Sequence, residues 1–340
     1  MPTLQDSQCS AAALALLLSA ALPVGAETIE VVCTVHEWCD VAQRGFHEAT
    51  GIQVSITELG SAKALERFTA EREKPQYDVW FGGTGEFHLQ AARLKLTLPY
   101  RSPNNSLLHA WGAKFAEQSG YRTNGLFSGP LAFVYNTRVL AAANAAAPRC
   151  WADLLKPEYR QLIQVGYPTG VYSVIATLVQ LMGEDEAFVY LKKLHGNVKN
   201  YPRSGTDALT NVSKGEAGVV VAFVYGANAD VASGPIVQMT TPCEGTGYEI
   251  GGMSIINGGP NPNGAKRFFD WALTADAQKL MGQTRQFNLA SNRNSRLDGR
   301  VVDSPSTRLV NYDFVKYGDL DERTRLLKKW QQTVDEERRP

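Results

Sequence analysis

Residues 28–84 read TIEVVCTVHEWCDVAQRGFHEATGIQVSITELGSAKALERFTAEREKPQYDVWFGGT, and this stretch predicts the class of fold. β-Rich runs alternate in it with segments whose apolar residues recur at helical spacing. The expected order is strand, helix, strand, helix, strand, at 28–35, 40–50, 52–59, 61–73 and 77–81. This order predicts parallel strands joined by crossover helices, which is the α/β class.

Ligands of such sheets bind beyond the carboxyl ends of the strands. In this stretch those ends are 35–37, 59–61 and 82–84. Ser61 stands where a side chain can cap the second helix, whose first backbone N–H groups have no partner within the helix. The same position suits an anion, so capping and ligand contact both stay open for Ser61.

A second α/β unit follows a long apolar run, GLFSGPLAFVYN at 125–136, which is expected to cross to a second lobe. Crossing strands are expected near 123–132 and 236–248, a strand at 218–225, and C-terminal helices at 263–282 and 321–337. We expect two α/β lobes, divided along the chain as a signal peptide at 1–26, the first part of lobe 1 at 27–124, lobe 2 at 125–240, and a return strand with C-terminal helices at 241–340.

The N-terminal segment 11–26 reads AAALALLLSAALPVGA and is typical of a cleaved secretory leader. It is shorter than the ~20 residues that span a bilayer, and it ends in small residues. Residues 1–10 carry no Lys or Arg, so a buried N-terminal helix or a misplaced start codon stays open. We expect the mature chain to be exported and to begin near Glu27.

Acidic and basic residues balance at 34 each, and no basic stripe is present. Nucleic acids and anionic membranes are therefore poor partner candidates. Beyond the leader the chain has four cysteines, and an even number in an exported protein indicates disulfides. We expect Cys33–Cys39 and Cys150–Cys243. Zinc is the alternative, but it needs closely spaced Cys or His ligands.

The segment 242–256 reads PCEGTGYEIGGMSII, a glycine-rich turn that runs into an apolar strand. Such a turn can present free backbone N–H groups and small hydroxyl side chains at the edge of a cleft. The segment carries no nucleophile–base pair and no metal-ligand cluster. It is typical of a chain that holds a small ligand without reacting with it.

Several phrases resemble bacterial ABC-transporter solute-binding proteins of the branch that includes ferric-iron-, hexose-phosphate- and 2-aminoethylphosphonate-binding members. Besides the glycine-rich turn, they are DVWFGG at 78–83, WADLLKPEY at 151–159, ATLVQLMGED at 176–185, and 261–279 with FFDWAL at 268–273. The likeness covers most of 28–285. It implies a two-lobed periplasmic receptor of type II, with two crossover strands as its hinge, that closes over a ligand. It also implies a monomer that docks on membrane permease subunits, with no nucleic acid and no cofactor.

The candidate ligand residues are small, hydroxyl-bearing or aromatic residues at loops expected to face the cleft. They are Ser61, Gly82, Gly83, Thr84, Thr169, Tyr172, Ser173, Ser204, Tyr225, Thr246, Gly247 and Tyr248. Converging helix N-termini and hydroxyl groups favour a small anion, and we expect a phosphate ester or a phosphonate. A plain capped turn is the alternative for 169–173, and a solvated surface charge is the alternative for Arg203 in the turn 203–206. Where hexose-phosphate-binding relatives carry a His–Asp pair, this chain has Tyr225, Gly226 and Asn228, which argues against a sugar held in that way.

Ferric iron is the alternative ligand, with His36, Glu37 and Tyr225 as the candidate set. Iron-binding relatives supply adjacent tyrosines, whereas Tyr225 stands between Val224 and Gly226. An enzyme is a remote alternative. The chain has no nucleophile elbow and no P-loop lysine, and no His, Asp and Ser stand in the order of a hydrolase triad.

Overall fold

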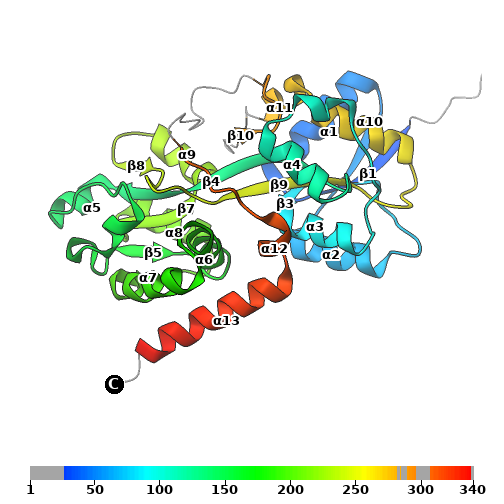
Figure 1. Ribbon diagram of the computed structural model, residues 1–340. Coiled ribbons are helices and arrows are strands. Elements are labelled where there is room, and N and C mark those ends of the chain that lie inside the picture. Colours follow the sequence, from blue (N-terminus) through cyan, green and yellow to red (C-terminus); the bar gives the residue numbers. More distant parts are fainter. Residues whose placement is uncertain (1–26, 282–283, 285–288, 296–306, 338–340) are drawn as a thin grey trace, which may run out of the picture.

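The computed structural model describes residues 27–281, 284, 289–295 and 307–337, and it places them in two α/β lobes joined by long strands (Figure 1). One twisted sheet runs through both lobes in the order β2-β1-β3-β9-β4-β7-β5-β6, with β8 and β10 (Leu289–Ala290) also paired to β4. The α/β class expected from residues 28–84 is confirmed.

The first lobe contains the predicted strand–helix alternation. Its parallel strands are β1 (Thr28–Cys33), β2 (Gln53–Glu58) and β3 (Val79–Thr84), and its helices are α1 (His36–Thr50), α2 (Ser61–Ala70), α3 (Gly85–Arg93), α4 (Ala110–Gln118), α10 (Pro262–Ala272) and α11 (Ala275–Met281). The single helix expected at 263–282 is therefore two helices. Strand β1 lies between β2 and β3, so the carboxyl ends of all three strands meet at one edge.

Two long strands connect the lobes, β4 (Asn124–Asn136) and β9 (Tyr248–Ile255) (Figure 1). The first half of β4 pairs antiparallel with β9, and its second half pairs with β7 in the second lobe. The crossing expected at 125–136 is confirmed. The expectation that 236–239 crosses back is wrong, because β8 (Val237–Thr240) pairs with the lobe 2 end of β4.

The second lobe repeats the parallel plan on a smaller scale. Its elements are α5 (Thr137–Ala142), β5 (Ile163–Val165), α6 (Thr169–Met182), α7 (Glu184–Asn197), β6 (Val198–Asn200), α8 (Gly205–Lys214), β7 (Val219–Phe223) and α9 (Val224–Ala232). The strand expected at 218–225 ends at Phe223, and the next residues begin α9. This difference moves Tyr225 from a strand into the first turn of a helix.

The core of the second lobe continues across the hinge into the first lobe. A cluster of buried residues includes Phe133 and Trp151 of lobe 2, Tyr248 of β9 and Phe115 of α4. The remaining core of lobe 1 packs on both faces of its own strands, with Phe81 in one cluster and Trp80 in another. The hinge is therefore packed with apolar side chains.

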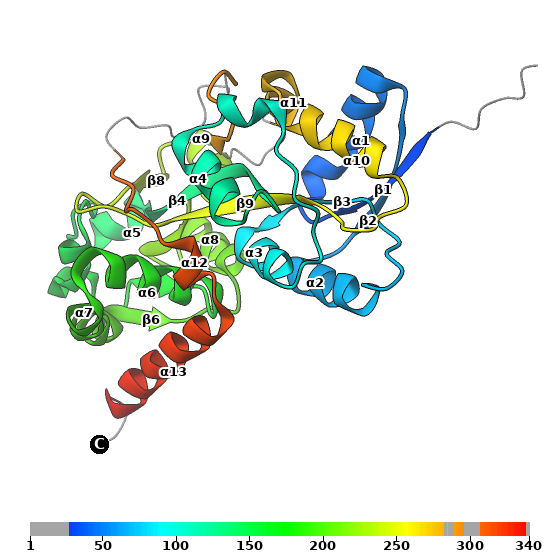
Figure 2. The same ribbon diagram turned by 45° about the vertical axis from the view of Figure 1, so that its right-hand side comes forward.

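The C-terminal segment contacts both lobes. The short helix α12 (Phe314–Tyr317) lies beside the hinge, and α13 (Leu320–Glu337) runs along the second lobe (Figures 1 and 2). Glu184 at the start of α7 holds α13 through Arg325 and Lys329. Trp330 stacks on Tyr167.

Among the helices that the structure describes, none has the length and apolar character of a membrane span. The segment read as a signal peptide, 1–26, lies outside the described residues.

Candidate functional site

The carboxyl edge of the first lobe brings four of the predicted residues together. Gly82 and Gly83 have φ angles of +76° and +93°, a backbone conformation that favours glycine. A Cβ on Gly83 would lie 2.6 Å from Ser61 Oγ, so the two loops are in direct contact. The N–H of Thr84 donates to Ser61 Oγ at 3.1 Å. Ser61 is the first residue of α2, and Gly60 is the N-cap of this helix. The Ser61 hydroxyl therefore holds the glycine turn and does not cap the helix.

His36 lies at the same edge, where α1 begins. Its Nδ1 is 2.6 Å from Glu58 Oε2, and both side chains are largely exposed. Glu37 also lies in the first turn of α1, but its side chain is outside the described set. Of the three residues named for iron, only His36 has a described side chain, and its imidazole is paired with a carboxylate that had not been included in the iron set.

The second lobe presents helix N-termini at the matching edge of its sheet. Gly166, which follows β5, abuts the backbone at Ser204 and the start of α8, because a Cβ there would lie 2.6 Å from those atoms. Ser204 caps α8, and its Oγ accepts from Asp207 N at 3.0 Å. Thr169 begins α6, but its side chain lies outside the described set.

Tyr172 lies behind the pocket-facing Ser173, under the guanidinium of Arg323 at 4.9 Å. Its side chain is buried, and its hydroxyl donates to the carbonyl of Tyr317 in the C-terminal segment. Tyr172 therefore joins α6 to the C-terminal segment, and its contact with the ligand stays a prediction.

The glycine-rich turn before β9 is more structural than predicted. Thr246 is fully buried, and its hydroxyl donates to the carbonyl of Leu131 at 2.9 Å. A Cβ on Gly247 would lie 2.1 Å from Thr177 Oγ1, so this glycine allows close packing against α6. Thr246 and Gly247 thus join the hinge to lobe 2 and do not line the cleft. Tyr225 begins α9, and its side chain lies outside the described set.

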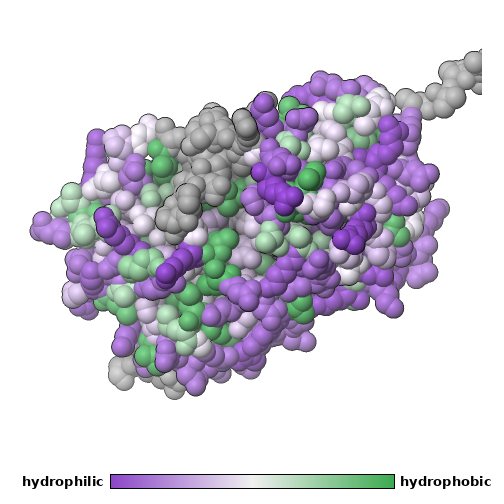
Figure 3. Space-filling view, turned by 45° about the horizontal axis from the view of Figure 1, so that its top comes forward, coloured by the Kyte–Doolittle hydropathy of each residue, from purple (hydrophilic) through white to green (hydrophobic). Residues whose placement is uncertain are grey.

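A pocket that opens to solvent lies between the lobes beside the hinge. Both lobes, both connecting strands and the C-terminal segment contribute to its wall. The lining residues are Thr84, Gly85, Glu86, Leu131, Ser173, Thr177, Phe223, Tyr248, Glu249, Ile250, Tyr312 and Phe314. Thr84, Ser173 and Tyr248 were predicted. On the face seen in Figure 3, apolar side chains gather along the boundary between two largely hydrophilic halves.

Two carboxylates, Glu86 and Glu249, line this pocket and were not predicted. Glu86 lies in the first turn of α3, where a negative charge is favoured, and pairs with Arg323 of α13 at 2.6 Å. Burial raises the pKa of Glu86 to about 7, with a further increase from the charge of Glu249, although Arg323 opposes the shift. The side chain of Glu86 is only 20% exposed. The pocket thus combines two carboxyl groups with several aromatic side chains.

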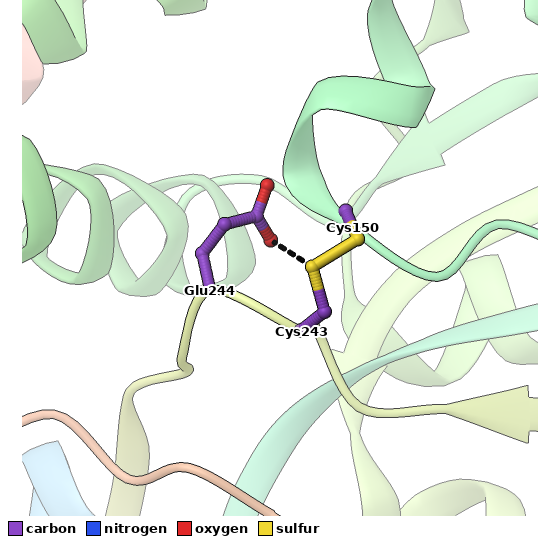
Figure 4. Close-up of side chains that lie close together, drawn as sticks. All are labelled: Cys150, Cys243 and Glu244. Atoms are coloured by element: carbon purple, nitrogen blue, oxygen red, sulfur yellow. Dashed lines mark hydrogen bonds between the residues drawn. A yellow bond between two sulfur atoms is a disulfide. The ribbon is translucent and has the colours of Figure 1, made fainter.

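Glu244 and the second disulfide hold the chain entering β9 against lobe 2 (Figure 4). Both expected disulfides, Cys33–Cys39 and Cys150–Cys243, are confirmed. The carboxylate of Glu244 accepts from the N–H groups of Trp151 and Ala152 at 2.8 and 3.1 Å. Within the described residues, Cys150, Cys243 and Glu244 form the one cluster with metal-ligand chemistry. Its sulfur atoms are joined to each other, so the cluster is a structural clamp and not a zinc site.

Two α/β lobes, joined by paired hinge strands and facing each other across a pocket, define a periplasmic binding protein fold of type II. The chain belongs to the bacterial extracellular solute-binding proteins, whose family model matches residues 76–316. This confirms the resemblance drawn from the sequence.

Three similar proteins illustrate the family. An uncharacterized protein of Haemophilus influenzae is 36% identical over 301 residues, covering 87% of each chain. A putative 2-aminoethylphosphonate-binding periplasmic protein of Salmonella typhimurium is 27% identical, covering 80% of this chain and 82% of the relative. The solved periplasmic binding protein AfuA of Actinobacillus pleuropneumoniae, with exogenous fructose-6-phosphate bound, is 34% identical with a TM-score of 0.80, covering 91% of this chain and 99% of that one.

Proposed function

We propose that the protein is the periplasmic solute-binding component of an ABC importer that captures a small phosphate ester or phosphonate and delivers it to membrane permease subunits. The observation that carries the proposal is the interlobe pocket, whose lining residues come from both lobes and which adjoins helix N-termini. A ligand that contacts both lobes favours the closed arrangement, because only that arrangement makes all the contacts. We further propose that the protein binds this ligand without chemical change.

The helix N-termini support an anionic group. Helices α2, α6 and α8 begin at the facing edges of the two lobes, and among their described side chains none is a first-turn carboxylate paired like Glu86 of α3. Unpaired N–H groups and the helix dipole favour a phosphoryl or phosphonyl group at such positions. Ser61 and Ser173 add hydroxyl groups, and each charge-assisted hydrogen bond contributes roughly 1.5–3 kcal/mol. Several such bonds would support micromolar or tighter binding.

The carboxyl groups of the pocket suit the other end of such a ligand. Glu249 would repel a phosphoryl group, whereas Glu86 is paired with Arg323, so we place the phosphoryl group at the N-termini of α2, α6 and α8. Carboxylates accept hydrogen bonds from hydroxyl or ammonium groups. The phosphate ester bound by AfuA carries hydroxyl groups, and the ligand named for the Salmonella relative carries an amino group. Both chemistries therefore fit the proposal.

The first test is identification of the ligand. Mass spectrometry of the small molecule released from the purified protein would name it directly. A thermal-shift panel of fructose-6-phosphate, 2-aminoethylphosphonate, inorganic phosphate and ferric citrate is the companion measurement. A ligand at 100 times its Kd adds about 2.7 kcal/mol to the free energy of unfolding, which is a readily measured shift.

A matched pair of serine variants tests the anion site. Ser61→Ala should weaken binding of the identified ligand about tenfold or more, through loss of a hydroxyl and of the support for Thr84 N–H. Ser106→Ala removes an exposed hydroxyl far from the pocket lining and should leave affinity unchanged. Stabilisation by ferric citrate alone would reject the anion and return attention to His36, Glu37 and Tyr225. Chemical turnover of the ligand would reject binding without reaction.

A further inference from the structure

A buried histidine lies directly behind the glycine turn of the first lobe. His88 of α3 is fully buried, and both ring nitrogens have polar partners. Nε2 lies 2.9 Å from the carbonyl oxygen of Gly82, and Nδ1 lies 2.8 Å from Ser254 Oγ on β9. The imidazole therefore connects the hinge strand to the turn.

The chemistry of the partners determines the tautomer. A carbonyl oxygen only accepts, so Nε2 carries the proton and donates to Gly82. In a neutral ring Nδ1 then accepts from the hydroxyl of Ser254. Burial lowers the pKa of His88 to about 3, so the ring is neutral at physiological pH. The ring therefore donates to Gly82 and not to Ser254.

The surroundings show that the ring position is built into the fold. Gly252 of β9 makes room for it, since a Cβ there would lie 2.5 Å from His88 Cδ2. The indole of Trp80 stacks on the imidazole with ring centroids 3.8 Å apart. Trp80 Nε1 donates in turn to Thr34 Oγ1 at 3.0 Å, and the Thr34 side chain packs against Gly83. The imidazole of His88 thus contacts Gly82 directly and Gly83 indirectly, through Trp80 and Thr34.

We propose that His88 is a positioning residue for ligand binding, which holds the carbonyl of Gly82 so that the N–H groups of Gly82 and Gly83 and the hydroxyl of Thr84 face the cleft. The reason is geometric. Gly82 and Gly83 have positive φ angles and little intrinsic preference for one conformation. A donor fixed behind the turn selects one orientation of its peptide groups. This inference rests on the proposed function, because it takes the turn to be part of the ligand site.

A pair of amide variants separates this role from simple packing. The side-chain amide of Gln reaches the position of Nε2, so His88→Gln can still donate to Gly82. The shorter Asn reaches the position of Nδ1, so His88→Asn can pair with Ser254 but leaves the carbonyl of Gly82 without a donor. Affinity is measured by calorimetry with fructose-6-phosphate and 2-aminoethylphosphonate as probes. Hydrogen exchange of the Thr84 amide, which donates to Ser61, reports the geometry of the turn without ligand.

We expect His88→Gln to bind the better probe within about threefold of wild type and to keep slow exchange at Thr84. We expect His88→Asn to lose affinity about tenfold, equivalent to about 1.4 kcal/mol, and to exchange faster at Thr84. Equal behaviour of the two variants, in both exchange and affinity, would overturn the proposal, since it would show that only ring packing matters. Failure of the wild type to bind either probe would count against the proposed ligand, while the exchange measurement would still decide the role of His88.

Discussion

Replacing Cys150 and Cys243 together by serine removes the bridge that ties the hinge to the second lobe. The bridge closes a loop with a sequence separation of 93 residues, whereas Cys33–Cys39 closes one of only 6. A cross-link stabilises a protein mainly by restricting its unfolded chain, and this effect grows with loop length. The two bridges therefore provide a matched comparison within one molecule.

The magnitude follows from the loop lengths. The chain-entropy relation gives about 4.6 kcal/mol for the long loop and about 2.2 kcal/mol for the short one at 25 °C. The folded state should change little, because nearby bonds hold the same segment. Cys243 N donates to Arg149 O at 2.8 Å, and Glu244 accepts from Trp151 N at 2.8 Å. The expected difference between the two double variants is therefore about 2.4 kcal/mol.

Urea unfolding followed by tryptophan fluorescence measures both costs. The Cys150→Ser, Cys243→Ser variant should have the lower midpoint and a larger m value, because its unfolded chain expands more. The Cys33→Ser, Cys39→Ser variant is the control. If the control lost as much stability as the long-loop variant, or more, the argument from the unfolded chain would be refuted. In that case the Cys33–Cys39 bridge would stabilise the folded β1–α1 loop by more than either bridge restricts the unfolded chain.

Three further predictions concern the pocket and its surroundings. Burial raises the pKa of Glu86 to about 7 in the folded state, against about 4.5 in the unfolded chain. The folded state therefore binds the proton more tightly, and raising the pH from 5 to 8 should lower the free energy of unfolding by up to ~3 kcal/mol. Urea titrations at several pH values measure this dependence, and Glu86→Gln should flatten it. Tyr172→Phe should cost about 1–2 kcal/mol, measured by thermal unfolding, because the carbonyl of Tyr317 loses its buried donor; no loss would contradict that bond. Gly251→Ala should cost about 1–3 kcal/mol in the same assay, since its Cβ would lie 2.0 Å from the ring of Phe127, and an unchanged melting temperature would show that the ring moves freely.

The sequence predicted the first lobe well because its signals are local. Each strand of residues 28–84 is a short β-rich run, and each helix has its own apolar spacing. Topology then places the strand ends at one edge without further information, which is why Ser61 and the glycine turn meet as expected. The cysteines were paired correctly from their even number and their positions.

The inner wall of the pocket could not be predicted in the same way. Glu86 lies in an ordinary first helical turn, and Glu249 is one polar residue in an apolar strand. Tyr312 and Phe314 come from a segment more than 60 residues after Tyr248 in the chain, and they meet it only through tertiary packing. No local pattern marks such residues as neighbours.

The glycine-rich turn was misread because glycine has two uses that look alike in a sequence. Free N–H groups at a cleft and close approach of packed elements both call for a residue without Cβ. In β9 the second use applies, since Gly251 accommodates Phe127 and Gly252 accommodates His88. The sequence did carry a signal for the second use. Gly251 and Gly252 are followed by apolar residues of the same strand, and a glycine pair inside a strand indicates close packing of a neighbouring side chain.

The C-terminal segment adds a third connection between the lobes, and its contacts differ in strength. Phe314 packs against Tyr248 on the hinge strand, with ring centroids 5.2 Å apart, where a rotation of one lobe displaces atoms least. The ion pair of Asp319 with Arg93 of the first lobe lies on the surface, with both side chains more than a third exposed. Exposed pairs of this kind contribute only about 0–1 kcal/mol. The second ion pair to the first lobe, Arg323 with Glu86, is largely buried at 2.6 Å. A lobe rotation would therefore break the exposed pair at little cost, but it would have to keep the buried pair or replace its bonds, since an unpaired buried charge is costly.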